Sequence, residues 1–209
     1  MKQHDRIAAL LIDFQEAFIG RNSPFNLLNT EQLVLLTRRL VTSLRKQAIP
    51  IIWTRVYLDD WAGSPYAEKW PQHFGADGKA IFLQRGSHSH AIVRGLRDLV
   101  EDRDILIDKP RYSAFIGTDL LARLQEMSIG EIFFAGVSTN VCVESTLRDA
   151  FQFGFRCKLI RECTLTFDAA LQAASERIIS MVFGEVVSLD EISAVGNAAL
   201  KSNLVTAEA

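Results

Sequence analysis

This chain of 209 residues has few cysteines, little net charge and no long apolar run. Its three cysteines are odd in number and are not arranged as a metal cluster or a small disulfide framework. The formal net charge is −2 and no Lys/Arg-rich block is present, so we expect no nucleic-acid partner. No apolar stretch approaches the ~20 residues that cross a bilayer, so we expect no membrane partner.

The amino terminus also lacks the pattern of a signal peptide, because residues 1–6 run straight into an apolar segment. We therefore expect a cytoplasmic protein, whose reducing surroundings would keep a reactive thiol reduced. The composition, 48% hydrophobic and 23% charged, is that of an ordinary globular protein. The length suits a single domain over residues 1–209.

Short apolar runs alternate with longer amphipathic segments, which is typical of βαβ units and a parallel sheet. The predicted strands are residues 6–13, 50–55, 104–108, the apolar run that ends at Gly136, 156–161 and 185–188. The predicted helices are residues 30–47, 118–127, a segment that carries Cys142 and ends near Phe153, 168–181, and a last helix from Asp190. The pattern therefore predicts an α/β protein.

The segment between Arg55 and His90 is unusually long and is rich in Gly, Pro, His and aromatic residues. Connections of this length in compact domains are usually functional or disordered, and the aromatic residues argue against disorder. We interpret the segment as a wall of the substrate pocket or as an oligomer contact. His88 and His90 have no carboxylate partner nearby, so we expect them to serve the loop or an interface rather than a metal.

Cys142 follows an apolar strand and the capping residues 138–140, which predicts that its thiol lies in the first turn of a helix. Unpaired N–H groups and the helix dipole stabilise negative charge there, so we expect a pKa below the ~8.5 of a free thiol. The alternative is an inert, buried cysteine. Two more ionisable residues favour a site, because Asp13 ends the first predicted strand and Lys109 ends the third. Ligand sites of parallel sheets form at that edge.

Three segments carry a resemblance to a known family: residues 9–15 (ALLIDFQ), 108–115 (DKPRYSAF) and 136–146 (GVSTNVCVEST). Over nearly its full length, the chain resembles the isochorismatase-like cysteine hydrolase superfamily, and within it the ureidoacrylate and biuret amidohydrolases. The resemblance implies a three-layer, Rossmann-like α/β/α fold with a six-stranded, doubly wound parallel sheet. It also implies an Asp–Lys–Cys catalytic triad, carried here by Asp13, Lys109 and Cys142, and homodimers or homotetramers.

The resemblance also places a cis peptide between Val137 and Ser138. We expect the backbone N–H groups of Ser138 and Cys142 to form the oxyanion hole. Four residues are predicted to contact the substrate: Gln15, Phe18, Arg111 and Tyr112. Arg is well suited to bind a carboxylate, but a structural ion pair is an equal alternative for Arg111.

The implied activity is metal-independent hydrolysis of a C–N bond in a small amide, ureido or carbamoyl compound, through a thioester or S-carbamoyl intermediate. No cofactor is expected. Nicotinamidases of the family carry an Asp-x-His…His metal site after the second strand, whereas this chain has no histidine there before His73. The isochorismatases proper lack the nucleophilic cysteine. Two alternatives stay open: a hydrolase of another small amide, such as a nicotinamide-like one, or a catalytically silent oligomeric binding protein.

Overall fold

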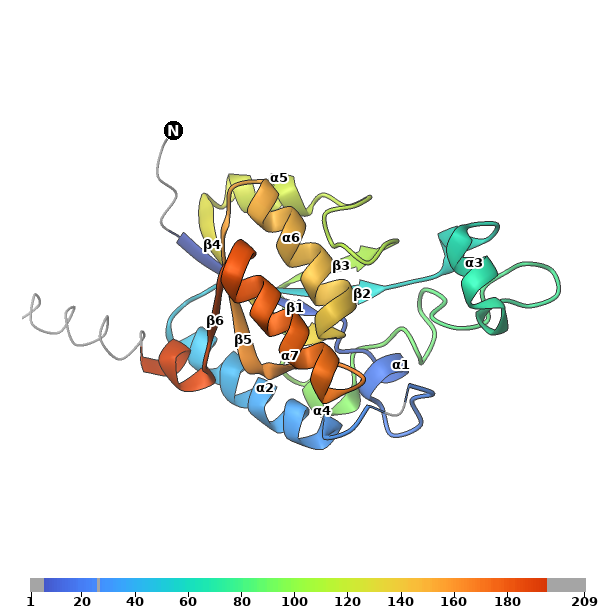
Figure 1. The fold of residues 1–209 in the computed structure, drawn as a ribbon, viewed down its shortest axis with the longest axis horizontal. Coiled ribbons are helices and arrows are strands. Elements are labelled where there is room, and N and C mark those ends of the chain that lie inside the picture. The colour runs from blue at the N-terminus through green and yellow to red at the C-terminus, as the bar shows by residue number, and fades with distance from the viewer. Residues whose placement is uncertain (1–5, 26, 195–209) are drawn as a thin grey trace, which may run out of the picture.

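The computed structural model describes residues 6–25 and 27–194 of the chain (Figure 1). Six parallel strands form one sheet in the order β3-β2-β1-β4-β5-β6. The strands are β1 (Arg6–Ile12), β2 (Ile51–Val56), β3 (Ile105–Lys109), β4 (Ile129–Val137), β5 (Arg156–Leu165) and β6 (Glu185–Val187). This is the predicted α/β fold with a six-stranded parallel sheet, and its strand order is that of a doubly wound sheet.

Helices cover both faces of the sheet. One face packs against α2 (Thr30–Lys46) and α4 (Arg94–Arg97), and the other packs against α5 (Leu120–Glu126) and α6 (Glu144–Gln152). Further helices are α1 (Glu16–Ile19), α3 (Pro65–Lys69) and α7 (Ala169–Ile178), and another helix begins at residue 189. Single 3₁₀ turns lie at η1 (Asp59–Trp61) and η2 (Pro71–His73), and π-helical turns at η3 (Thr139–Val143) and η4 (Ile179–Phe183).

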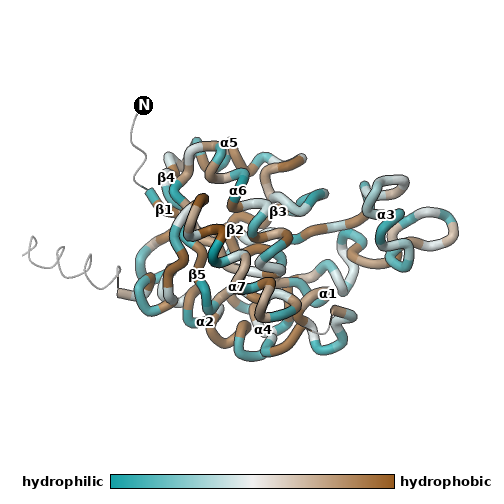
Figure 2. Tube along the Cα trace, in the orientation of Figure 1, coloured by the Kyte–Doolittle hydropathy of each residue, from teal (hydrophilic) through white to brown (hydrophobic). Residues whose placement is uncertain are grey.

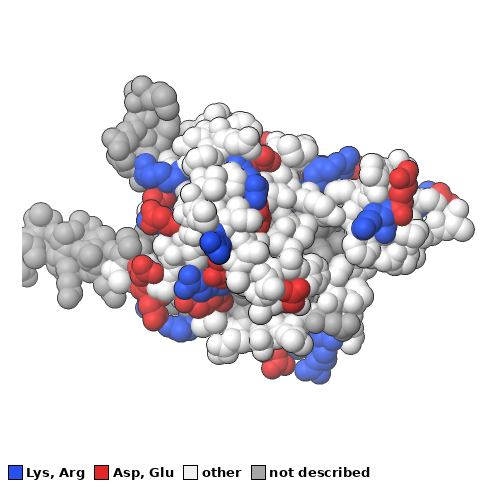
Figure 3. Space-filling view, viewed as in Figure 1, with Lys and Arg blue, Asp and Glu red and all other residues white. Residues whose placement is uncertain are grey.

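The central strands are buried on both sides, as a parallel sheet between two helical layers requires. Along β1, Ala9 and Leu11 face the layer that contains α2, whereas Leu10 and Ile12 face the layer that contains α6. Figure 2 shows the result as brown central strands beneath helices of mixed colour. On the face drawn in Figure 3, basic and acidic side chains are interspersed and neither sign forms a broad surface. Within the described residues, no helix is long and apolar enough to pass through a bilayer.

The observed strands and long helices lie within a few residues of the predicted ones. Two differences concern the predicted site. The helix that carries Cys142 opens with the π-helical turn η3 rather than a regular α-turn. The short helix α1, directly after β1, was not predicted. The predicted last helix is present from residue 189 to residue 194, and its continuation lies outside the described residues.

Residues 57–90, which we call the arm, extend beyond the carboxyl end of β2 (Figure 1). The arm has an apolar cluster of its own, in which Leu58, Trp61 and Leu83 are buried together with Ala17 of α1. The predicted loop is therefore an ordered segment with a small core. That core joins the arm to the edge of the sheet where β1 and β2 end.

Candidate active site

The predicted site residues come together at the carboxyl edge of the sheet. Asp13 directly follows β1, Lys109 is the last residue of β3, and Cys142 lies in η3 after β4. Strands β1 and β4 are neighbours at the centre of the sheet, where the chain connections diverge to either side. Ligands of doubly wound folds bind in the crevice outside the strands at this switch point.

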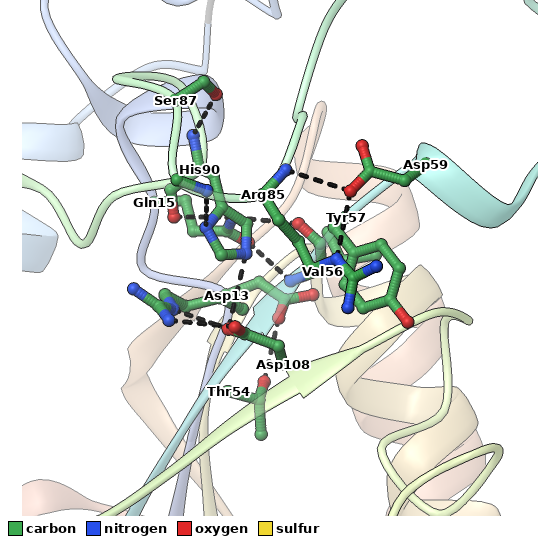
Figure 4. Close-up of polar contacts among 12 residues, drawn as sticks. Asp13, Gln15, Thr54, Val56, Tyr57, Asp59, Arg85, Ser87, His90 and Asp108 are labelled. Atoms are coloured by element: carbon green, nitrogen blue, oxygen red, sulfur yellow. Dashed lines mark hydrogen bonds and ion pairs between the residues drawn. The ribbon is translucent and has the colours of Figure 1, made fainter. Parts of the chain in front are cut away.

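Asp13 and Lys109 form an ion pair that is completely shielded from solvent. Lys109 Nζ lies 2.7 Å from Asp13 Oδ2, and both side chains are 0% exposed. Thr54 on β2 donates a hydrogen bond of 2.8 Å to the other carboxylate oxygen (Figure 4). The Lys109 ammonium also donates to the carbonyl oxygens of Arg111 at 3.0 Å and Tyr112 at 2.9 Å. Burial acts to lower the pKa of Lys109, but Asp13 and a negatively charged Cys142 together outweigh it, so the pKa is raised.

The backbone brings Asp13 close to the end of β4. Asp13 has a φ of 55°, in the left-handed region that aspartate tolerates better than most residues. Gly136 has a φ of 136°, and a Cβ atom there would lie 2.1 Å from the carbonyl oxygen of Ile12. Only glycine lets the two strand ends approach this closely. The break in the apolar run at Gly136 therefore has a physical cause next to Asp13.

The Cys142 thiol lies close to the ion pair, because the charges of Lys109 and Asp13 both act on its pKa. It is only 5% exposed, and burial raises its pKa even though the charge of Lys109 acts to lower it. The expectation of a lowered pKa for Cys142 is therefore wrong for the free protein. The cost of burying the charged thiolate outweighs the stabilisation that the helix terminus gives it. Burial thus favours the neutral form of the Cys142 thiol, which lies near the Asp13 carboxylate.

The turn that carries the thiol is fixed by hydrogen bonds from its neighbours. Thr139 donates to Gln172 Oε1 of α7 at 2.8 Å. Thr146 donates to the Cys142 carbonyl oxygen at 2.7 Å and accepts a hydrogen bond of 3.1 Å from the Ala114 N–H. The peptide bond between Val137 and Ser138 is cis, and Ser138 is buried directly before η3.

Gln15 has a different position from the one expected of a substrate contact. Its amide nitrogen donates to the carbonyl oxygens of Val56 and His90, each at 3.0 Å, and its oxygen accepts from the Val56 N–H at 2.8 Å (Figure 4). These bonds indicate that Gln15 ties β1, β2 and the end of the arm together. Phe18 packs its ring 5.3 Å from that of Phe25.

His90 supports the arm beside Asp108, the residue before Lys109, a role that spacing alone could not reveal. It is buried, its Nδ1 accepts from the Gly86 N–H at 3.3 Å, and its Nε2 lies 3.3 Å from Asp108 Oδ1 (Figure 4). Burial acts to raise the pKa of Asp108, but the neighbouring His90 and Arg55 side chains together outweigh it, so the pKa is lowered. His88 is exposed. Across residues 6–25 and 27–194, no three His, Cys, Asp or Glu side chains converge as metal ligands.

Arg111 and Tyr112 lie beside the site. The guanidinium carbon of Arg111 is 4.7 Å from the centre of the Trp61 ring, and Nη1 donates to the Pro110 carbonyl oxygen at 2.6 Å. In the described part of the chain no carboxylate pairs with Arg111, so the structural ion pair considered for it is not found there. Burial, together with the charge of a Cys142 thiolate, raises the pKa of Tyr112 to about 12.

Comparison with known proteins shows a family match over most of the chain. Residues 8–191 match the isochorismatase domain. The chain is 30% identical over 160 residues to the ureidoacrylate amidohydrolase RutB of Methylobacterium radiotolerans, a match that covers 68% of this chain and only 60% of that protein's length. It is also 30% identical over 200 residues to nicotinamidase 3 of Arabidopsis thaliana, covering 93% of this chain and 92% of that protein. The crystal structure of a cysteine hydrolase from Pseudomonas syringae superposes with a TM-score of 0.83 at 22% identity, covering 95% of each chain.

Proposed function

The chain belongs to the isochorismatase domain family, and on that basis we propose that it is a cysteine amidohydrolase of small ureido, carbamoyl or amide compounds. It cleaves a C–N bond other than a peptide bond. The observation that carries the proposal is the solvent-free ion pair of Asp13 and Lys109, which lies so close to the Cys142 thiol that both charges act on its pKa. An acid-base group, a cation and a nucleophile thus meet at one point.

In the proposed reaction, Asp13 accepts the Cys142 proton as the sulfur attacks the substrate carbonyl carbon. Lys109 keeps its charge throughout, so it stabilises the thiolate as it forms and holds the Asp13 carboxylate in place. The backbone N–H groups of Ser138 and Cys142 bind the oxyanion. Asp13 then returns the proton to the departing nitrogen, which leaves a thioester or S-carbamoyl group on Cys142.

Water completes the cycle. Asp13, again a carboxylate, takes a proton from a water molecule, which attacks the carbonyl carbon of the intermediate. The carbon–sulfur bond breaks and the proton passes to Cys142, which restores the neutral thiol. The resting state is therefore the one that the buried site favours, and the thiolate exists only while Lys109 and the substrate stabilise it.

The names of the relatives support a small ureide or amide as the substrate. The first-named relative is called a ureidoacrylate amidohydrolase and the second a nicotinamidase. A ureido or carbamoyl compound is our leading candidate, and a nicotinamide-like amide is the second. We further propose that the enzyme needs no metal or other cofactor, works in the cytoplasm and assembles as a homodimer or homotetramer.

Ammonia release from a substrate panel tests the proposal. The panel contains biuret, ureidoacrylate, N-carbamoyl amino acids and nicotinamide, each assayed before and after exhaustive chelation. We expect turnover of at least one ureido or carbamoyl compound at a rate that chelation leaves unchanged. Activity confined to nicotinamide, lost on chelation and restored by one metal, would contradict the proposal.

A further inference from the structure

Six side chains of the arm and the adjacent loops form a continuous aromatic group at the carboxyl edge of the sheet. We call it the collar: Phe25, Trp61, Tyr66, His73, Phe82 and Tyr112. Neighbouring rings lie 4.5 to 6.0 Å apart, in the order Tyr112, Trp61, Tyr66, His73, Phe82 and Phe25. Four members belong to the arm, and the other two follow β1 and β3. The arm's aromatic residues therefore pack onto their own subunit.

The collar borders the reactive group through Tyr112. The backbone oxygen of Tyr112 accepts a hydrogen bond of 2.9 Å from Lys109 Nζ, and its ring lies 6.2 Å from that of Tyr66. Burial raises the pKa of both tyrosines, and a negative charge on Cys142 would raise it further. A substrate bound to Cys142 therefore has its remaining atoms beside these rings.

Within these rings, Tyr66 and His73 form a polar pair. The Tyr66 hydroxyl lies 2.8 Å from His73 Nδ1. Burial raises the pKa of Tyr66 and lowers that of His73, so both are neutral near pH 7. If Nδ1 carries the proton, the tyrosine O–H is free to donate; in the other tautomer the tyrosine oxygen is free to accept. Either way, Tyr66 keeps one hydrogen-bonding position for another molecule.

We propose that the collar binds the part of the substrate that lies beyond the scissile bond, and that Tyr66, oriented by His73, is a specificity-determining residue. The group it takes is flat and unsaturated, because such groups stack on aromatic rings, and it carries a ring atom that hydrogen-bonds with Tyr66. This inference rests on the proposed function, since it describes the substrate of the same site. His73 acts through Tyr66 and is a positioning residue.

Calorimetric titration of the Cys142→Ala protein tests the inference without requiring turnover. The probes are methylurea, phenylurea and 3-pyridylurea, which share the carbamoyl group and carry no charge that Arg111 could bind. We expect phenylurea to bind at least ~10-fold more tightly than methylurea, and 3-pyridylurea about fivefold more tightly than phenylurea through one added hydrogen bond. Equal affinity for methylurea and the two arylureas would overturn the assignment of the collar.

Substitutions in the same background test the polar pair. Tyr66→Phe should abolish the preference for 3-pyridylurea and leave phenylurea within twofold of its starting affinity. His73→Phe, which keeps an aromatic ring in the collar, should have the same effect by releasing Tyr66. Tyr57→Phe is the matched control, because the Tyr57 hydroxyl is also on the arm but bonds to Asp60 at 2.8 Å. If the Tyr66 and His73 variants weaken both arylureas equally, or neither, the polar pair does not determine specificity.

The two proposals fail differently. Should the wild-type enzyme hydrolyse no ureido, carbamoyl or amide compound while Cys142→Ala still prefers arylureas, the collar stands and the proposed reaction is wrong. Should the enzyme turn over small ureides with no aryl preference in binding, the reaction stands and the collar assignment is wrong.

Discussion

The Asp13–Lys109 pair shows at the scale of single residues how this site combines stability with chemistry. Both charges lie where water cannot reach them, and Thr54 and two backbone carbonyls complete their hydrogen bonds. Each charge is tolerable only because the other is present. The sequence could predict these residue types at strand ends, but not the raised pKa of Cys142. That shift depends on burial, which the assembled fold creates.

Removing one partner of the pair should therefore cost both stability and activity. We expect Lys109→Met to lower the free energy of unfolding by about 3–5 kcal/mol, because Asp13 is left as an uncompensated buried charge. Ammonia release should be lost as well. Urea denaturation measures the first effect.

The exposed pair of Arg123 and Asp119 provides the control for this measurement. Arg123→Met should change the free energy of unfolding by less than about 1 kcal/mol. If Lys109→Met were as stable as the wild type, Asp13 would not be held as a charged partner in the folded protein.

At the scale of elements, the sequence predicts the sheet better than its edge. Strands such as β1 and β2 are predicted correctly because short, continuous apolar runs bounded by polar residues adopt few other structures. The helix α1 is only four residues long, too short for helical periodicity to reveal. The π-helical turn η3 and the ordered arm depend on contacts between distant segments, among them the hydrogen bonds of Gln15 and His90.

The close approach of β1 and β4 at Gly136 gives a prediction at the scale of elements. We expect Gly136→Ala to lower the free energy of unfolding by more than about 3 kcal/mol or to prevent folding, since its Cβ would overlap a backbone carbonyl that cannot move aside. Gly154→Ala is the matched control. Gly154 also has a positive φ, of 91°, but no atom lies within 4 Å of the added Cβ, so the cost should be about 1–2 kcal/mol. Equal losses in urea denaturation would mean that the close approach of β1 and β4 is not what requires glycine.

At the scale of the whole molecule, the reason to expect an oligomer has changed. The sequence left two roles open for the arm, an oligomer contact or a wall of the substrate pocket; Trp61 is buried within its own chain, whereas Trp70 is 38% exposed. More strongly exposed apolar side chains lie at the end of α6 and in η4, where Phe151 is 45%, Met181 71% and Val182 55% exposed. Phe151 and Phe183 also contact each other, with ring centres 5.6 Å apart. Apolar surface of this kind is typical of interfaces.

Light scattering at micromolar concentration should give the mass of a dimer or tetramer. We expect the double substitution Phe151→Glu and Met181→Lys to lower that mass, because it places charges in the proposed contact. Leu28→Lys, at a residue that is 73% exposed, should leave the mass unchanged. A monomeric wild-type protein with full activity would show that assembly is not needed for the site.

The most direct test of the account is the mass of the enzyme quenched in acid during turnover of the best substrate from the panel. We expect a carbamoyl or acyl adduct on the peptide that contains Cys142, with no adduct on Cys157 or Cys163. We also expect that Cys142→Ala folds normally, forms no adduct and releases no ammonia, whereas Cys157→Ala remains active. Ammonia release by Cys142→Ala at the wild-type rate, or an adduct on another cysteine, would contradict Cys142 as the nucleophile.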